Sequence, residues 1–413
     1  MTMKIGILAS NAPRFKGDYF SPWLLELGYN LSQEYDSAVV VIAPHYPGTK
    51  QFELIDGIEM HRFKYMPESL ELLGYGRYFP HESIGNRNKV KLFSTYICNS
   101  FLMLFLLSYM FINTIKICKK EKIDILFSHW IFPCGLIGLF AAKILKVEPI
   151  LKIYGTDLVF MKKFKLTWLG RWILNSYSKI VANSEYTKNV ALSFGINDIE
   201  KIKVIPEGVY PPKSIENEEL DKLRRKHGIN NEKIIFSVHR LIPLKGTEYL
   251  IKAASLVVKE YPDVKFIIAG EGPMRTELES LIEELNLADN VILTGFIPEE
   301  RLPLYYALCD IYVISSIKDE EGNTEGLGVP VIEAMSYGKP VIGFDVGGPK
   351  YTIKDGINGF SVKEKDWKVM GEKILELLKD EGLREKFGEK GREIYYEEYT
   401  WDGVVEEYKK VIT

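Results

Sequence analysis

Short apolar runs alternate with stretches of helical periodicity along almost the whole chain. The first series of candidate buried strands lies at residues 5–9, 38–43, 123–128, 150–153, 180–182 and 203–205. A polar, proline-bearing segment at 211–233 precedes the second series, at residues 234–238, 264–269, 291–294, 311–314, 341–343 and 359–362. Strands separated by helices are typical of β-α-β units and parallel sheets. The pattern therefore predicts an α/β protein with two Rossmann-like parallel-sheet domains joined by a linker, whose sites lie at the carboxyl ends of strands.

One segment departs from this pattern. Residues 92–115 carry no charged side chain, and by length they are a candidate for a membrane-spanning helix. Expected strands lie on both sides of the segment, and if those strands pair in one sheet the chain cannot cross a bilayer between them. We therefore expect a buried helix of the first domain, with an exposed apolar surface for membrane docking or self-association as the alternative.

The last predicted element is a helix that begins after Thr400, a candidate N-cap. At helical spacing Trp401, Val404, Val405 and Tyr408 share one face. We expect this face to be buried.

Composition narrows the class of protein. The chain has 413 residues, of which 46% are hydrophobic and 26% charged, which excludes a disordered tail, a collagen and a disulfide miniprotein. The formal charge of -3 is uneven, because residues 1–200 hold 23 Lys and Arg against 17 Asp and Glu. This asymmetry argues against a uniformly basic nucleic-acid binder, whereas the basic half suits a phosphate-bearing acceptor or a membrane surface.

The cysteines and the first residues bear on location. The 4 cysteines form no Cys-x-x-Cys pair, which suits a reducing compartment. No signal peptide is visible in residues 1–10. We expect a cytoplasmic protein, with peripheral membrane contact as an open alternative.

The familiar glycine motifs for nucleotides are absent. The segment after the first expected strand, residues 10–18, holds one glycine, Gly17, and neither the Gly-x-Gly-x-x-Gly fingerprint nor a Walker loop occurs. NAD chemistry and P-loop phosphoryl transfer are therefore disfavoured.

Residues 323–340 carry the most informative motif. Gly326-Leu327-Gly328 follows the strand expected at 311–314 and precedes a short helix, which Pro330 opens and Gly338 closes. Backbone amides and the positive end of a helix dipole make such a loop a site for a diphosphate.

Two carboxylates flank this loop. Glu325 precedes it and Glu333 lies in the helix, so both can line one pocket and accept hydrogen bonds from a vicinal diol without a metal. The alternative is a solvated helix start that acidic residues stabilise.

A second cluster, residues 237–247, follows the first strand of the second half. Arg240 and Lys245 are two cations at a strand-to-helix turn, where they can hold a pyrophosphate and stabilise it as it leaves. Thr247 is a candidate cap of the next helix. Taken alone, this pair is equally compatible with two solvated surface cations.

Together the clusters resemble retaining glycosyltransferases of family 4 (glycosyl transferases group 1), which have the GT-B fold of two Rossmann-like domains facing across a cleft. The similarity is strong from about residue 236 to 362 and looser over the first 200 residues. The stronger matches are Glu325-x7-Glu333, Arg240 with Lys245-Gly246, 269–272, Thr294-Gly295-Phe296, 204–209 and Gly347-Gly348. The looser matches are the Gly17 loop, His129-Trp130 with Pro133 and Gly135, Tyr154 to Asp157, and 181–184.

The resemblance implies a division of the chain and a set of roles. Residues 1–208, joined by the C-terminal helix 399–413, correspond to the acceptor-side domain, and residues 209–398 to the nucleotide-sugar domain. Glu333 would hold the ribose, and Glu325 with the backbone of Gly326, Leu327 and Gly328 would contact the donor sugar. The diphosphate would lie against Arg240, Lys245 and the Gly17 amide, and the base near Gly295 and Phe296.

The resemblance also implies the reaction. A sugar would pass with retained configuration from a nucleoside-diphosphate sugar to a hydroxyl of a sugar, lipid-linked or small-molecule acceptor, in polysaccharide or glycoconjugate synthesis. No cofactor is implied, and since the chain has no Asp-x-Asp pair, we expect no metal. The alternatives are a GT-B sugar phosphorylase, a sugar-nucleotide epimerase and a sugar-nucleotide-binding protein without turnover.

The sequence departs from the family pattern at three places. Tyr154 stands where the family often has His, Lys350 and Tyr351 follow Pro349 in place of a common Glu, and Glu207 replaces a frequent Asn. His129, Tyr154 and Asp157 remain candidates for a cleft role. The alternatives are a packed core histidine for His129 and a loop cap for Asp157.

Overall fold

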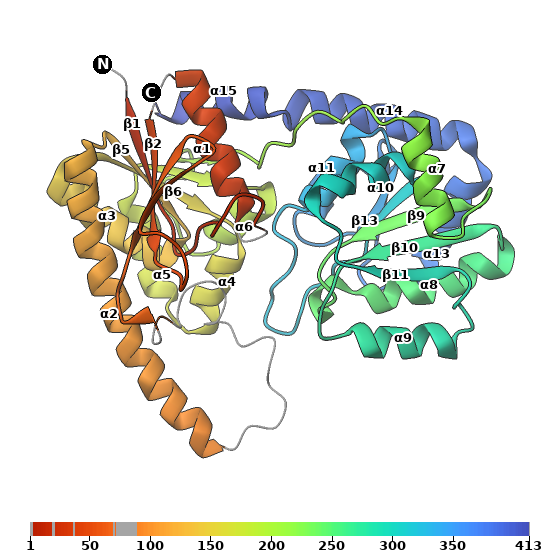
Figure 1. Cartoon of the computed structure of the whole chain (residues 1–413), viewed down its shortest axis with the longest axis horizontal. Helices are drawn as coiled ribbons and strands as arrows, with labels where there is room; N and C mark the ends of the chain where they lie inside the picture. The colour runs from red at the N-terminus through yellow and green to blue at the C-terminus, as the bar shows by residue number, and fades with distance from the viewer. Residues whose placement is uncertain (1–2, 19–20, 36–37, 69–70, 72–88, 413) are drawn as a thin grey trace. The chain divides into compact units, whose positions relative to one another are not determined.

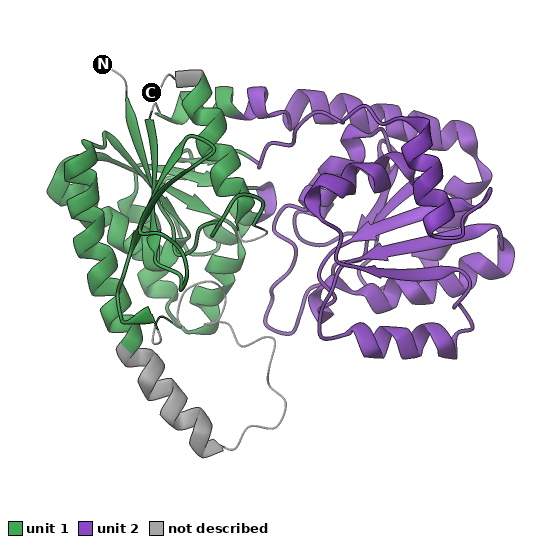
Figure 2. Ribbon diagram, viewed as in Figure 1, with its two compact units in different colours: residues 1–183, 187–205, 405–413 green, residues 184–186, 206–404 purple. Residues whose placement is uncertain are grey.

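The computed structural model describes residues 3–18, 21–35, 38–68, 71 and 89–412, and the chain forms two compact units (Figure 1, Figure 2). Unit 1 comprises residues 1–183, 187–205 and 405–413, and unit 2 comprises residues 184–186 and 206–404. Both units are built on a sheet of parallel strands, with one antiparallel edge strand in unit 1, and the alternation of strands and helices predicts the parallel part.

Unit 1 contains an eight-stranded sheet in the order β3-β4-β2-β1-β5-β6-β7-β8. Its strands are β1 (Lys4–Leu8), β2 (Ala38–Pro44), β3 (Phe52–Ile55), β4 (Ile58–Phe63), β5 (Ile125–His129), β6 (Glu148–Ile153), β7 (Lys179–Ala182) and β8 (Ile202–Val204). The helices in this part of the chain are α1 (Pro22–Tyr35), α2 (Lys89–Glu121), α3 (Leu136–Leu145), α4 (Thr156–Lys163), α5 (Thr167–Ser176) and α6 (Glu185–Leu192). All six expected strands of the first series are present.

The hairpin of β3 and β4 is an addition that the apolar runs did not predict. The two strands pair antiparallel, and Asp56 and Gly57 form the turn between them with φ of 50° and 81°. An Asp-Gly turn with two positive φ angles matches the twist of a two-stranded ribbon. The sequence pattern does not predict β3, because the strand is short and largely exposed and therefore has no apolar run.

Helix α2 contains the uncharged segment. β1 lies between β2, which precedes α2, and β5, which follows it. Because strands on both sides of α2 share one sheet, the helix does not carry the chain across a bilayer, as predicted. Leu102, Leu106 and Met110 are buried in the core of unit 1.

The expectation that this helix is buried is only partly correct. Residues 102–121 pass the length and hydropathy criteria for a span, with a mean hydropathy of 1.5, yet only 28% of that stretch is buried. The part of the segment before Leu102 has no described side chains. An apolar face of α2 is therefore left at the surface.

Unit 2 contains a six-stranded parallel sheet in the order β11-β10-β9-β12-β13-β14. Its strands are β9 (Lys233–Val238), β10 (Val264–Ala269), β11 (Val291–Gly295), β12 (Ile311–Ile314), β13 (Val341–Phe344) and β14 (Gly359–Val362). Its helices are α7 (Asn217–Lys226), α8 (Thr247–Glu260), α9 (Arg275–Glu284), α10 (Leu302–Leu308), α11 (Val329–Ser336), α12 (Pro349–Thr352), α13 (Trp367–Lys379) and α14 (Glu381–Glu398). Every strand of the second series is present, whereas the expected linker 211–233 proves to contain α7, which packs on α10.

The chain ends in helix α15 (Trp401–Ile412), whose residues are divided between the two units. The Gly403 amide donates to Thr400 Oγ1 at 3.3 Å, so the predicted N-cap is confirmed. Trp401, Val404, Val405 and Tyr408 are all buried, as predicted. Within unit 1 the fully buried Lys152 of β6 donates to the Tyr408 hydroxyl at 2.6 Å.

Candidate functional site

Three neighbouring strands of unit 2 bring the predicted motifs together. β9, β12 and β13 are consecutive in the sheet. Arg240 and Lys245 follow β9, Glu325 follows β12, and the Gly347-Gly348 pair follows β13. Because parallel strands end at one edge of the sheet, residues far apart in the sequence become neighbours there.

The Lys245 ammonium and the Glu325 carboxylate form an ion pair, with both side chains largely buried. Burial acts against the charged form of Glu325, but the charges of Lys245 and Arg240 and a hydrogen bond from the Gly328 amide outweigh it and lower the pKa of the carboxyl. Glu325 is therefore ionised at neutral pH. Lys245 is therefore part of a built cluster and not a solvated surface cation, whereas Arg240 is exposed beside it.

The loops around this pair approach too closely for any side chain but glycine. A Cβ on Gly246 would lie 2.2 Å from the Ser315 carbonyl oxygen, and a Cβ on Gly348 would lie 2.3 Å from the Gly326 carbonyl oxygen. The Gly348 amide donates to the Glu325 carbonyl at 2.8 Å. Gly348 thus lets the β13 loop lie against the Glu325 loop, and Gly246 lets the β9 loop lie against the end of β12.

The glycine-rich loop leads directly into α11. Gly328 has a φ of 86°, Pro330 lies in the first turn, and Gly338 follows the helix end with a φ of 66°, so the predicted boundaries are confirmed. Leu327 has its side chain in the core of unit 2. Of this residue, only the backbone is available to a ligand.

Glu333 has a different electrostatic environment from Glu325. The Tyr306 hydroxyl donates to its carboxylate at 2.5 Å. Burial raises the pKa of Glu333 to about 7, the Tyr306 hydrogen bond lowers it, and the charge of Glu299 adds to the rise. At neutral pH this carboxyl is thus close to its midpoint, unlike Glu325.

His239 belongs to this cluster although the sequence did not single out its role. Its Nε2 lies 2.8 Å from Thr247 Oγ1 and its Nδ1 lies 3.2 Å from Ser237 Oγ. Burial, with the charge of Lys245, lowers its pKa to about 3, so the ring is neutral and ties β9 to the start of α8. The predicted cap role of Thr247 is wrong, because α8 begins at Thr247 itself and its hydroxyl bonds to His239.

The remaining candidates for donor binding lie at loop positions. Gly295 ends β11 with a φ of 77°, and Phe296 after it is largely exposed, with 64% of its surface accessible. Gly17 lies in the β1–α1 loop of unit 1 with a φ of 79° and open space beside its Cα.

In unit 1 the three cleft candidates also lie together, at the ends of β5 and β6. His129 Nδ1 is 2.7 Å from the Tyr154 hydroxyl, and Trp23 stacks on the His129 ring with centroids 5.3 Å apart. His129 is fully buried, and burial with the Lys152 charge holds its pKa well below the usual value. Its Nε2 has no hydrogen-bond partner among the described residues.

Asp157 acts on backbone amides. Its carboxylate accepts from the amides of Ile131 at 2.9 Å, Tyr154 at 3.1 Å and Leu158 at 3.0 Å. Burial raises its pKa, and these hydrogen bonds partly offset the rise. The arrangement matches the loop-cap alternative.

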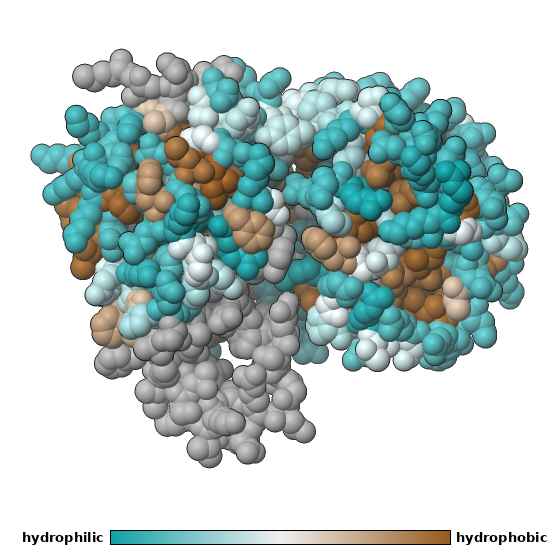
Figure 3. Space-filling model, viewed as in Figure 1, coloured by the Kyte–Doolittle hydropathy of each residue, from teal (hydrophilic) through white to brown (hydrophobic). Residues whose placement is uncertain are grey.

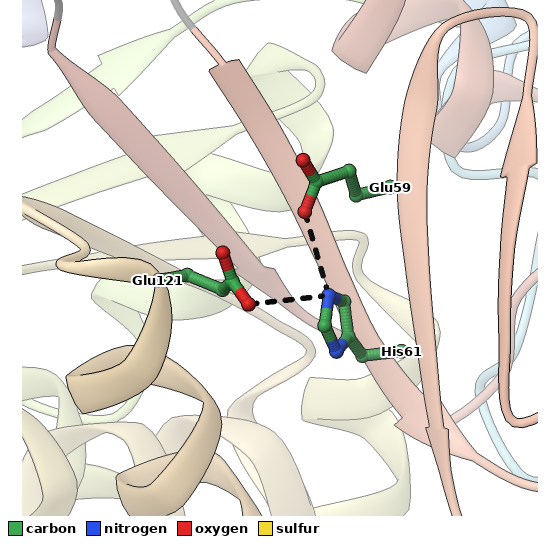
Figure 4. Close-up of side chains that lie close together, drawn as sticks. All are labelled: Glu59, His61 and Glu121. Atoms are coloured by element: carbon green, nitrogen blue, oxygen red, sulfur yellow. Dashed lines mark hydrogen bonds and ion pairs between the residues drawn. The ribbon is translucent and has the colours of Figure 1, made fainter.

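A separate cluster in unit 1 has ligand types that suit a metal ion. Ligand atoms of Glu59, His61 and Glu121 lie within 4.8 Å of one another (Figure 4). Glu121 is also paired with Lys4 at 3.4 Å and Lys120 at 3.0 Å. These lysines already supply the counter-charge, so the cluster is an ion-pair network.

Family models of known proteins match both halves of this chain. The family model described as Glycosyl transferases group 1 matches residues 220–394, and the one described as Glycosyltransferase Family 4 matches residues 26–211. An uncharacterized glycosyltransferase of Methanocaldococcus jannaschii is 32% identical over 233 residues, which are 55% of this chain and 58% of that protein. N-acetyl-alpha-D-glucosaminyl L-malate synthase of Bacillus anthracis is 25% identical over 303 residues, covering 72% of this chain and 76% of that enzyme.

Among solved structures, HepE of Anabaena in complex with UDP superposes with a TM-score of 0.75 at 19% identity, covering 99% of both chains. That similarity concerns the fold, and it agrees with the two parallel-sheet units. With family models matching each half of the chain, this protein belongs to the glycosyltransferases of family 4 and has the GT-B fold.

Proposed function

We propose that this protein is a retaining glycosyltransferase that moves a sugar from a nucleoside-diphosphate sugar to an acceptor hydroxyl. The observation that carries the proposal is the Lys245–Glu325 ion pair beside Arg240, at the entrance to the Gly326–Gly328 loop. It combines cations for a diphosphate with a carboxylate for sugar hydroxyls in one cluster.

Different residues bind different parts of the donor. Arg240 and Lys245 bind the diphosphate, and the amides at the start of α11 face the same charge. Glu333 holds the ribose hydroxyls, and Tyr306 orients its carboxylate. Glu325, kept ionised by the two cations, accepts hydrogen bonds from the donor sugar.

The reaction needs a stabilised leaving group more than a protein nucleophile. The bond between the anomeric carbon and the diphosphate oxygen breaks while the acceptor oxygen bonds to that carbon from the same face. The acceptor proton passes to the departing diphosphate. Arg240 and Lys245 stabilise the charge that develops on the leaving group, which is the step where fixed cations contribute most. We propose that they do so without a metal ion.

The comparisons support this proposal in two ways. HepE was solved with UDP and with UDP-glucose. The B. anthracis relative is named for an alpha-D-glucosaminyl product, the anomer that retention yields from an α-linked donor. We propose UDP as the first nucleotide to test.

The test begins with binding. The melting temperature is measured with UDP, GDP and ADP and with their sugar conjugates, each with and without EDTA. We expect one nucleotide series to stabilise the protein and EDTA to leave the effect unchanged. No stabilisation by any of them would refute the proposal.

Turnover and stereochemistry complete the test. The stabilising donor is incubated with soluble and lipid-linked acceptors, and the anomeric coupling constant of the product is read by NMR. If the protein is an enzyme, it should release nucleoside diphosphate and the Glu325→Gln variant should not. A protein that only binds the donor would release none. An inverted product would contradict the retaining mechanism.

A further inference from the structure

Helices α2, α3 and α5 form one continuous layer on unit 1. α3 packs against both α2 and α5. The Phe140 ring of α3 and the Trp172 ring of α5 meet with centroids 5.9 Å apart.

Large apolar side chains point outward from this layer. Phe140 and Ile144 are one turn apart on α3, and Trp168 and Trp172 are one turn apart on α5. All four are exposed, Trp168 most of all at 69%. Figure 3 shows apolar surface at the left edge of unit 1, where α2 and α3 lie.

Helix α2 continues this surface. Leu104, Phe105, Tyr109 and Ile112 are exposed on this helix, whereas Leu106 and Met110 are buried. The three helices thus present several large apolar side chains together, whereas isolated exposed apolar residues need no explanation.

The charges within the sequence stretches that hold α3 and α5 have one sign. The sequence has no Asp or Glu in 131–147 or in 158–176. The same stretches carry the exposed cations Lys143, Lys146, Lys162, Lys163, Lys165 and Arg171.

We propose that the outward face of α3 and α5, with the described part of α2 beside it, docks on an anionic lipid bilayer. Tryptophan favours the level of the lipid headgroups, where its ring is half apolar and half polar. Surface lysines are attracted to anionic lipid, and apolar side chains between them enter the boundary of the acyl chains. A second copy of this chain is a poorer occupant, because a two-fold interface would bring these cations against one another.

The docking surface is tested with the full chain and two kinds of vesicle. One vesicle is phosphatidylcholine alone, and the other replaces a third of it with phosphatidylglycerol. We expect the protein to sediment with the anionic vesicles, to stay in solution with the neutral ones, and to be released by salt. Retention in the supernatant with both would overturn the proposal.

Two double variants locate the surface. W168S with W172S, and K163E with K165E, should each require at least about tenfold more anionic lipid for half-maximal binding. Matched controls in unit 2, I357S with Y396S and K259E with K386E, change exposed residues of similar kind and should bind as the unaltered protein does. Equal loss in the controls, or none in the test variants, would contradict the assignment.

Light scattering without lipid measures the oligomeric state and tests whether a second copy of this chain covers the surface instead. A dimer that W168S with W172S converts to a monomer would assign the face to a second copy and overturn the lipid proposal. Donor-induced stabilisation is measured in parallel. Because that readout lies in unit 2, failure of docking and failure of the proposed glycosyl transfer give different results.

Discussion

The two units place different chemistry at the same position of the same kind of sheet. At the strand ends of unit 2, Lys245 and Glu325 are both charged and paired, with Arg240 exposed beside them. At the strand ends of unit 1, His129 is neutral, fully buried and stacked on Trp23. The Asp157 carboxylate accepts hydrogen bonds from three backbone amides. Position in a Rossmann-like sheet therefore indicates where a site lies, while burial and hydrogen bonding decide whether a polar residue is available to a ligand.

The difference assigns separate consequences to substitutions in the two clusters. In the unit 2 cluster Arg240 is exposed beside the Lys245–Glu325 pair, and under the proposed function loss of these residues should affect binding and turnover. In the unit 1 cluster Asp157 and His129 Nδ1 bond to the protein itself, so loss of these bonds should affect stability.

The largest effect is expected for Lys245→Ala. Loss of a cation that stabilises the leaving diphosphate should reduce turnover about a hundredfold or more and weaken binding of the free nucleoside diphosphate. The measurements are steady-state kinetics and calorimetric titration. Lys259→Ala, on the exposed end of α8, is the matched control and should change neither. Undiminished affinity for the diphosphate would refute the role of Lys245.

Asp157→Ala should act on stability instead. It leaves the amides of Ile131, Tyr154 and Leu158 without their acceptor in a buried loop, which should cost about 2–3 kcal/mol in the free energy of unfolding. Denaturant titration measures this cost. The nucleotide affinity of the folded fraction should be unchanged. A loss of turnover beyond the fraction unfolded would show that Asp157 serves the site as well.

The sequence predicts much of the fold and of the position of both clusters. The parts that it does not predict have physical causes. Strand positions followed from apolar runs, and the Gly326–Gly328 loop and Glu333 from the glycine, proline and acid spacing around α11. What short-range patterns do not encode is long-range hydrogen bonding. Asp157 was an open choice between a site and a cap because its Ile131 partner lies 26 residues away.

The role of His239 was missed for a related reason. Its sequence neighbours suggested only a strand end, and its link to Thr247 depends on how α8 begins. The hairpin of β3 and β4 escaped because its first strand is too exposed to form an apolar run. Its Asp56-Gly57 turn was the available signal.

Glu333→Gln should separate function from stability within unit 2. Because burial raises the pKa of Glu333 to about 7, the folded state holds a proton there that the unfolded state loses near pH 4.5. Stability from this group is complete below pH 4.5 and is lost as the pH rises through 7.

The neutral variant should therefore have a larger free energy of unfolding than the unaltered protein at pH 8, by up to about 3 kcal/mol, and the difference should vanish at pH 4.5. The affinity for the donor should fall at pH 8, and also at pH 4.5 if binding is measurable there, because the amide is a weaker acceptor for ribose hydroxyls than the carboxylate. Melting curves across the pH range, with and without nucleotide, give both results. A stability difference that does not change with pH would contradict the raised pKa.

The smallest effect is expected for Tyr154→Phe. This change removes the hydroxyl bonded to His129 Nδ1 while keeping the ring that packs on Trp23. The buried imidazole then loses the described partner of its Nδ1, and its Nε2 has no hydrogen-bond partner among the described residues. This loss should lower the free energy of unfolding by about 1 kcal/mol. Donor binding should not change. If turnover instead drops tenfold while stability holds, Tyr154 contacts a substrate, and unit 1 would carry reactive polar groups as unit 2 does.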